Sequence, residues 1–148
     1  MDLNPYLAFD GQCEEAFTFY ARVLGAKIEM MLNHADSPMA AQTPPEWQKK
    51  IMHARLKRDG QTLMGSDAPP GRYEKPSGFF VSVGVKTPEE ADRIFGELSK
   101  NGAVHMPIQE TFWAKRFGML VDKYGTPWMV NCEKEPDQSP PQNPGVCS

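Results

Sequence analysis

The sequence has few cysteines and no regular spacing between them. Its three cysteines, Cys13, Cys132 and Cys147, are odd in number and lie far apart. Such a set suits reduced thiols better than a disulfide framework. No Cys-x-x-Cys pair is present to hold zinc or to carry out redox chemistry. We therefore expect a cytoplasmic protein.

The sequence also has little net charge and no long apolar run. Its 16 basic and 19 acidic residues give a formal charge of −3. That balance creates no field to attract phosphate backbones or anionic lipid, so nucleic acid and membrane surfaces are poor partners. No apolar run approaches the roughly 20 residues of a spanning helix, and the first residues lack the pattern of a signal peptide. A small molecule is the default partner.

The first half of the chain carries the pattern of a β-α-β-β-β module. Apolar residues recur every three or four positions from Cys13 to Leu24, as on the buried side of a helix, and Gly25 follows as a left-handed cap. Pro5 has no amide hydrogen, so the strand around it should lie at a sheet edge. The proline-containing segment 34–47 is a candidate lid. Short apolar runs predict strands at 3–9, 27–32, 51–57 and 61–65.

The same order restarts after a segment rich in proline and glycine. Thr87 and Pro88 predict a helix start, and Asn101-Gly102 predicts its end. Strands are expected at 79–85, 103–106, 117–121 and 128–132, the last two joined by a turn at 122–125. The predicted fold class is α+β, with two βαβββ modules forming curved antiparallel sheets around a cavity. The predicted organisation is a first module at 1–68, a linker at 69–78, a second module at 79–133 and a disordered tail at 134–148.

Two runs of residues are similar to those of a known superfamily. One is Phe19-Tyr20 followed by Val23-Leu24-Gly25, and the other is Trp113…Arg116-Phe117-Gly118…Asp122-Lys-Tyr-Gly-Thr-Pro-Trp128. With the paired modules, they resemble the vicinal oxygen chelate superfamily of glyoxalases, bleomycin-resistance proteins and extradiol dioxygenases, and within it the PhnB-like branch. The resemblance covers residues 3 to 133. It implies a homodimer.

Characterised members of that superfamily hold one divalent metal through four side chains. The resemblance places those positions at Pro5, at His53 or Arg55, at Phe80 and at Met129. Such a metal needs several His or carboxylate ligands, and only His53 offers one. We therefore expect no bound metal and no other cofactor. PhnB-like proteins are sometimes labelled ubiquinone methyltransferases, but the sequence has no glycine-rich strand-to-helix turn to cradle an adenosyl cofactor.

The residues expected to line a ligand site come from both modules. Alternation puts His53 and Arg55 on one strand face, suited to an anionic or enolic substrate with His53 as acid or base, although a solvated polar face explains the same pattern. Arg116 beside Trp113 predicts an anion site with an aromatic wall, or only a stacked guanidinium. Cys13, Cys132 and Trp128 are expected in the core. The predicted ligand wall is Phe9, His53, Arg55, Phe80, Trp113, Arg116 and Met129.

Three functions fit these patterns. The first is a PhnB-like protein that binds a small organic ligand without a metal, with no catalytic residue assigned. The second is a lyase, isomerase or dioxygenase whose metal site has been rebuilt around His53 and Glu133. The third is a resistance protein that sequesters its ligand. The sequence does not decide whether the protein is an enzyme.

Overall fold

The computed structural model of the protein describes residues 1–135. The chain divides after Pro76 into two compact units, and the division falls within the predicted linker at 69–78. Most of the tail predicted at 134–148 lies outside the described residues. None of the described helices is long and apolar enough to cross a membrane.

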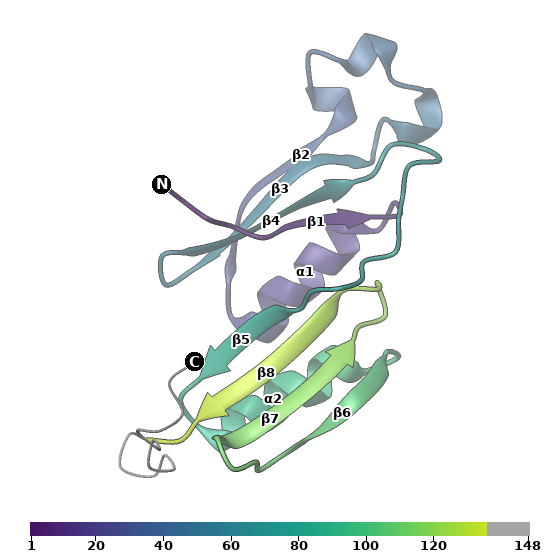
Figure 1. Ribbon diagram of the computed structural model, residues 1–148. Helices are drawn as coiled ribbons and strands as arrows, with labels where there is room; N and C mark the ends of the chain where they lie inside the picture. Colours follow the sequence, from purple (N-terminus) through teal and green to yellow (C-terminus); the bar gives the residue numbers. More distant parts are fainter. Residues whose placement is uncertain (136–148) are drawn as a thin grey trace. The chain divides into compact units, whose positions relative to one another are not determined.

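The first unit is a β-α-β-β-β module with three short 3-10 helices after its second strand (Figure 1). Its strands form one sheet in the order β1-β4-β3-β2. Strands β1 and β4 run parallel, and the other neighbours run antiparallel. Its elements are β1 (Tyr6–Phe9), α1 (Cys13–Leu24), β2 (Lys27–Asn33), η1 (His34–Asp36), η2 (Ala40–Gln42), η3 (Pro45–Trp47), β3 (Ile51–Arg58) and β4 (Gln61–Asp67).

The second unit repeats this topology without the 3-10 helices. Its strand order β5-β8-β7-β6 has the same single parallel pair, between β5 and β8. The predicted α+β fold with two βαβββ modules is confirmed. Each sheet is mixed rather than purely antiparallel, because the first strand of each module lies parallel to the last. The elements are β5 (Val81–Val85), α2 (Pro88–Ser99), β6 (Ala103–Gln109), β7 (Ala114–Val121) and β8 (Pro127–Glu133).

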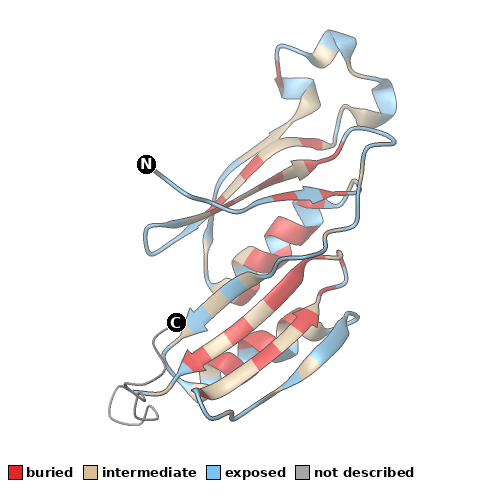
Figure 2. Ribbon diagram, in the orientation of Figure 1, coloured by how far each residue is buried: buried red, intermediate tan, exposed pale blue. Residues whose placement is uncertain are grey.

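Each helix covers one face of its own sheet, and the core of each unit lies between them. Figure 2 shows buried residues along both helices and the strands beneath them. In the first unit, the ring of Phe9 lies 6.0 Å from that of Phe17 and 6.4 Å from that of Tyr20, both on α1. In the second unit, Ile94 of α2 and Trp128 of β8 are each 1% exposed. Burial of these large apolar side chains favours folding of each unit.

The predicted helix caps are present. Gly25 ends α1 in the left-handed region, with φ of 63°, and the Thr87 hydroxyl accepts a hydrogen bond from the Glu90 amide at the start of α2. After α2 the left-handed residue is Asn101, with φ of 59°, rather than Gly102. Gly102 is needed for a different reason, because a Cβ there would lie 2.4 Å from the Val121 carbonyl oxygen.

Several strands differ in their bounds from those expected. Strand β6 runs through Pro107 to Gln109, whereas the prediction ended it at residue 106. Because β6 is an edge strand, a residue without an amide hydrogen is tolerated there. Strand β1 is also at an edge, as predicted, and the Pro5 carbonyl accepts a hydrogen bond from the Met64 amide.

The Asp-x-x-Gly-x-x-Trp motif of the second unit is structural. The buried carboxylate of Asp122 accepts hydrogen bonds from the amides of Tyr124 at 2.8 Å and Thr126 at 3.0 Å. It also accepts one from Trp128 Nε1 at 2.8 Å. Gly125 has φ of 91°, a positive value that glycine adopts readily, and it lies in the turn predicted at 122–125. One carboxylate thus joins the β7–β8 turn to the core tryptophan.

Candidate functional site

The sheet of the first unit has one face covered by α1 and one that α1 does not cover, here called the open face. On β3, Ala54 and Leu56 are buried, whereas His53 and Arg55 between them are only half-buried. The alternation of a strand therefore places His53 and Arg55 on the open face, as predicted from the sequence. His53 and Arg55 are therefore polar side chains on the strand face that α1 does not cover.

A row of four residues crosses this open face. The strand register pairs Tyr6 with Met64, Met64 with Arg55, and Arg55 with Met30. Paired residues on neighbouring strands lie on the same face, so Arg55 stands between two thioethers. Tyr6 and Met30 are 49% and 44% exposed, so both ends of the row are accessible.

Tyr6 also contacts His53 on the same face. The Tyr6 hydroxyl and His53 Nδ1 lie 3.2 Å apart and share a hydrogen bond whose donor depends on the histidine tautomer. The two rings are stacked, with centroids 5.8 Å apart. Because Nδ1 is engaged by Tyr6, Nε2 is the ring atom that His53 can offer to a ligand.

The guanidinium of Arg55 has a buried nitrogen without a hydrogen-bond acceptor in the described chain. Its Nε is buried and has no hydrogen-bond partner among residues 1–135. Its Nη2 lies 4.0 Å from the Met64 sulfur, a weak acceptor. Within the described chain, no carboxylate forms an ion pair with it. A guanidinium stays charged at any physiological pH, so this group is a cation without a counter-charge in its own unit.

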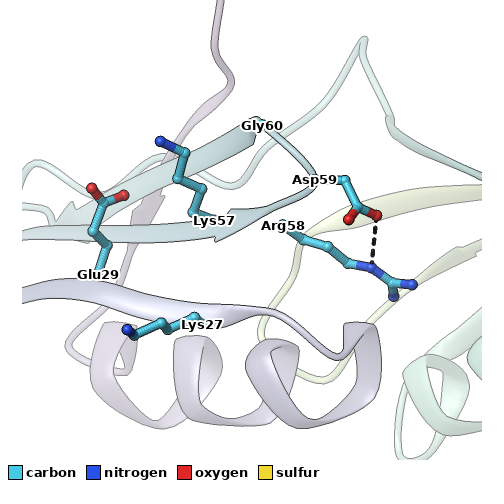
Figure 3. Close-up of a pocket in the computed structure, with 6 residues that line it drawn as sticks. All are labelled: Lys27, Glu29, Lys57, Arg58, Asp59 and Gly60. Atoms are coloured by element: carbon cyan, nitrogen blue, oxygen red, sulfur yellow. Dashed lines mark hydrogen bonds and ion pairs between the residues drawn. The ribbon is translucent and has the colours of Figure 1, made fainter.

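A shallow hollow lies at the β3–β4 turn of the same unit, with a volume of about 390 Å³. Lys27 of β2 and Lys57 of β3 are paired in register there, and like charges directly opposite each other disfavour pairing. Figure 3 shows the Arg58 guanidinium turned toward Asp59, with which it forms an ion pair at 3.3 Å. The hollow is lined by Lys27, Glu29, Lys57, Arg58, Asp59 and Gly60.

The second unit presents aromatic and thioether side chains on the face opposite α2. Buried residues alternate along β8, so Met129 and Asn131 lie on this face, where they pair with Met119 and Phe117 of β7. The ring of Trp113 lies 5.4 Å from that of Phe117. The side-chain oxygen of Asn131 is buried without a partner in the part of the chain that the structure describes.

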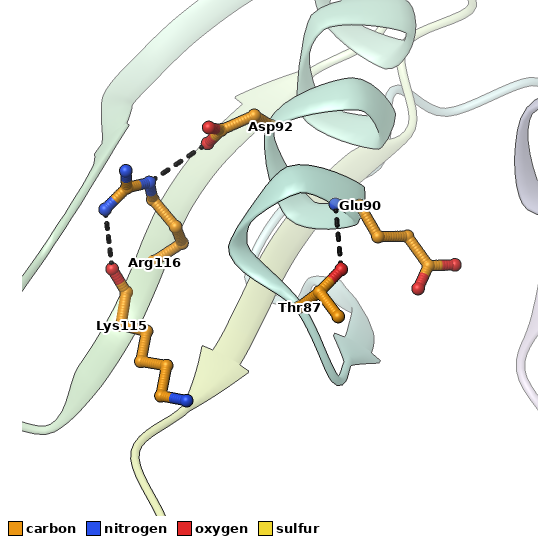
Figure 4. Close-up of polar contacts among 5 residues, drawn as sticks. All are labelled: Thr87, Glu90, Asp92, Lys115 and Arg116. Carbon is orange, nitrogen blue, oxygen red and sulfur yellow. Dashed lines mark hydrogen bonds and ion pairs between the residues drawn. The ribbon is translucent and has the colours of Figure 1, made fainter.

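Two residues of the predicted ligand wall lie elsewhere. Arg116 is on the α2 side of its sheet, where its Nε donates to the Asp92 carboxylate at 3.1 Å and its Nη1 to the Lys115 carbonyl (Figure 4). Arg116 alternates with the buried Gly118 and Leu120 along β7 and pairs with the buried Cys132 of β8, so it lies on the helix-covered face of the sheet. Phe9 is 1% exposed and packs against α1 in the core. Both side chains lie on the helix-covered face of their sheet, which corrects their placement in the wall.

The other predicted wall residues are distributed between the units. His53 and Arg55 share the open face of the first sheet. Phe80, just before β5, is 37% exposed, and Trp113, just before β7, is 43% exposed. Tyr6, Met30 and Met64 were not predicted as site residues. Strand alternation alone could have indicated Tyr6, but the bulge in β2 between Ile28 and Met30 hides which β2 residues share a face with Arg55.

The surroundings of Cys13 do not favour a nucleophilic thiolate. Its side chain is fully buried, and burial raises the pKa of the thiol well above its ordinary value; the carboxylates of Asp67 and Glu14 raise it further. Its amide donates to Asp67 Oδ1 at 2.9 Å, and Asp67 Oδ2 accepts from the Ile51 amide at 2.7 Å. Asp67 thus joins the start of α1 to the start of β3.

The residues at the superfamily's metal positions do not suit a hard divalent ion. The side chains of Pro5 and Phe80 carry no donor atom, and the Met129 thioether suits soft metals rather than magnesium or manganese. Across residues 1–135, no three His, Cys, Asp or Glu side chains cluster as metal ligands. Both strand-to-helix turns are also capped from within the chain, by Asp67 before α1 and by Thr87 before α2.

A family model and a curated relative match most of the chain. The model described as 3-demethylubiquinone-9 3-methyltransferase matches residues 1–131. Protein YjdN of Escherichia coli K12 is 38% identical over 143 residues, which cover 91% of this chain and 97% of YjdN.

Solved structures show the same similarity. Protein PA1353 of Pseudomonas aeruginosa is 45% identical, with a TM-score of 0.84 over 91% of this chain and 99% of that protein. The PhnB protein of Bacillus cereus is 27% identical, with a TM-score of 0.75 over 89% of this chain and 99% of that protein. A glyoxalase/bleomycin resistance protein/dioxygenase from Nocardioides shares the fold. It is 20% identical, with a TM-score of 0.55 over 97% of this chain and 90% of that protein.

Proposed function

The chain belongs to the family described as 3-demethylubiquinone-9 3-methyltransferase, the PhnB-like branch of the vicinal oxygen chelate superfamily, and on that premise we propose that it binds a small organic ligand on the open face of its first sheet. We propose further that binding needs no metal at the superfamily's four positions. The observation that carries the proposal is the Tyr6–Met64–Arg55–Met30 row beside the Tyr6–His53 pair.

This composition is typical of small-molecule sites. Such sites are mostly apolar and carry a few polar groups that fix the ligand's orientation. The thioethers of Met30 and Met64 supply an adaptable apolar surface, because methionine has three rotatable bonds and a polarisable sulfur. Arg55 and His53 supply the polar groups. A solvated strand face of purely structural function would not need a half-buried guanidinium without a counter-charge.

The family's description suggests methyl transfer, but the turns before the two helices do not favour that reaction. That reaction needs a methyl donor held beside its acceptor, and in adenosyl-cofactor enzymes a glycine-rich turn supplies the cradle. Here the turn before α1 holds the Asp67 carboxylate and the turn before α2 holds the Thr87 hydroxyl. We infer that the protein is a cytoplasmic homodimer, the assembly that the superfamily resemblance implies. Phe80, Trp113 and Met129 of the second unit stay predicted ligand-contacting residues.

The first experiment is a fluorescence titration with N-phenyl-1-naphthylamine, a neutral probe that brightens in apolar surroundings. The wild type should bind it, and Ala8→Trp should weaken binding by about tenfold, since Ala8 is an exposed residue that alternation places on the open face beside Tyr6. Glu15→Trp adds the same ring at an exposed position on α1 and should leave binding unchanged. Equal affinity in all three proteins would overturn the proposed location.

Metal analysis tests the second half of the proposal. Protein purified without chelators and dialysed should hold well under one equivalent of zinc, nickel, manganese or iron, and EDTA should leave probe binding unchanged. Retention of one equivalent through dialysis, lost in a His53→Ala variant, would overturn the metal-free proposal. That result would favour a metal-dependent lyase, isomerase or dioxygenase.

A further inference from the structure

We propose that the ligand of the open face carries a carboxylate or a similar oxyanion, and that the Arg55 guanidinium binds it. This inference rests on the proposed function, because it names the chemical class of ligand for the same face. It starts from the buried Nε of Arg55, which has no acceptor in the described chain.

A guanidinium in this position calls for an acceptor. Burying a charged donor without a partner is unfavourable, and a permanently charged group cannot avoid the cost by losing its proton. The edge formed by Nε and one Nη is one of the forks by which arginine binds carboxylate through two parallel hydrogen bonds. In Arg55 the Nε of that fork has no acceptor among the described residues, and Nη2 lies 4.0 Å from the Met64 sulfur, a weak acceptor.

Two other arginines of the chain donate a hydrogen bond from Nε to a carboxylate. Arg116 directs its Nε at Asp92 Oδ1, at 3.1 Å. Arg58 directs its Nε at Asp59 Oδ2, at 3.3 Å. Both carboxylates belong to the chain itself. Arg55 follows a different pattern, and the inferred oxyanion would stand where those arginines have Asp92 and Asp59.

The neighbours of Arg55 define the rest of the ligand. Met30 and Met64 flank it in register, so the oxyanion must be attached to an apolar body rather than being a free inorganic ion. Lys57 lies two residues along β3 on the same face and adds positive charge within reach of the bound group. The class of ligand that fits is therefore an organic acid with an apolar skeleton.

Two matched probes separate charge from apolar contact. 8-Anilinonaphthalene-1-sulfonate has the rings of N-phenyl-1-naphthylamine plus one sulfonate, which stands in for the ligand's oxyanion. Wild-type protein should bind the sulfonate probe about tenfold more tightly than the neutral one. Arg55→Met should abolish that preference while changing affinity for the neutral probe less than about twofold, and Arg55→Lys should keep part of it. Arg116→Met is the control and should keep the full preference.

The outcomes distinguish this inference from the proposed function. If both probes bind and Arg55→Met weakens them equally, the oxyanion assignment is wrong, although the face still binds ligands. If Lys57→Met removes the preference and Arg55→Met does not, the anion site lies at the lysine pair and the assignment to Arg55 is overturned. If neither probe binds the folded wild type, both proposals fail. Urea unfolding of each variant, monitored by tryptophan fluorescence, establishes that the proteins compared are folded.

Discussion

Replacing Arg55 with methionine should stabilise the protein. Arg55 stands between Met30 and Met64 in register, so a third thioether continues the apolar row. The substitution removes a buried Nε without a partner and a charge without a counter-ion in its own unit. Residues kept for binding often reduce stability in this way, because the site is incomplete until the ligand arrives.

The size of the effect follows from the groups removed. An unsatisfied buried donor costs about 1–3 kcal/mol. Arg55 is only half-buried, and water screens the part of its charge that is exposed, so we expect the lower end, a gain of about 1 kcal/mol. Arg116→Met is the matched control. It removes an ion pair whose side chains are 35% and 49% exposed, a pair that contributes only about 0.2–1 kcal/mol, so that variant should be slightly less stable.

Urea unfolding at pH 7 gives the comparison directly. With an unchanged slope, the midpoint of Arg55→Met should rise and that of Arg116→Met should fall slightly, and the two variants should differ by about 1–2 kcal/mol. If Arg55→Met lowers the free energy of unfolding by as much as Arg116→Met or more, the guanidinium is satisfied in the folded protein. The argument for an incomplete site would then be refuted.

Three further predictions concern the framework. Asp122→Ala should lower the free energy of unfolding by about 3 kcal/mol or more, because it leaves two amides and Trp128 Nε1 without their acceptor. Asp92→Ala, at an exposed position, should lower it by less than about 1 kcal/mol in the same urea assay, and similar losses in the two variants would contradict the structural role of the motif. Gly102→Ala should lower the free energy of unfolding by about 1–3 kcal/mol, because its Cβ would meet the Val121 carbonyl. Gly84→Ala, whose Cβ would enter open space, should change that free energy by no more than about 0.5 kcal/mol. Equal urea midpoints for the two variants would show that the chain relaxes around residue 102. The pKa of Cys13 in the folded protein is raised above its ordinary value of 9.0, so above pH 9.0 the unfolded chain loses a proton that the folded chain keeps. The free energy of unfolding should therefore fall above pH 9.0 by up to about 1.4 kcal/mol per pH unit, relative to that of Cys13→Ala. Parallel pH profiles for the two proteins would refute this.

Local patterns in the sequence predicted most of the framework because the signals were themselves local. The apolar stripe of α1, the left-handed Gly25, the Thr87 cap and the Gly125 turn each depend on residues within a few positions of one another. Repetition of these signals in the two halves was enough to predict two βαβββ modules. The parallel pairing of the first and last strand in each module joins residues far apart in sequence, and it was not foreseen.

The site was predicted less well because it depends on strand register. Alternation placed His53 and Arg55 correctly on one face of β3. Arg116 was assigned to the wrong side although its alternation with Gly118 and Leu120 along β7, both buried, indicates the helix-covered face. Phe9 shows a simpler error, since a large apolar residue alternating with exposed Tyr6 belongs under the helix rather than in a ligand wall.

Two properties of the open face could not be read from sequence. One is the lack of an acceptor at Arg55 Nε, which depends on every side chain around it. The other is the pairing of Tyr6 with His53, two residues 47 positions apart that are brought together by the parallel register of β1 and β4. Both properties carry the functional argument, and both come from tertiary structure.

The most direct test of ligand binding at this face is methionine-methyl NMR during titration with 8-anilinonaphthalene-1-sulfonate. The nine methionines can be labelled at their methyl groups and assigned by single Met→Leu substitutions. We predict that the methyl resonances of Met30 and Met64 shift in proportion to occupancy, while that of Met39, in the segment between β2 and β3, does not. Saturation of the probe with Met30 and Met64 unmoved would contradict the assignment of the ligand face to the first sheet.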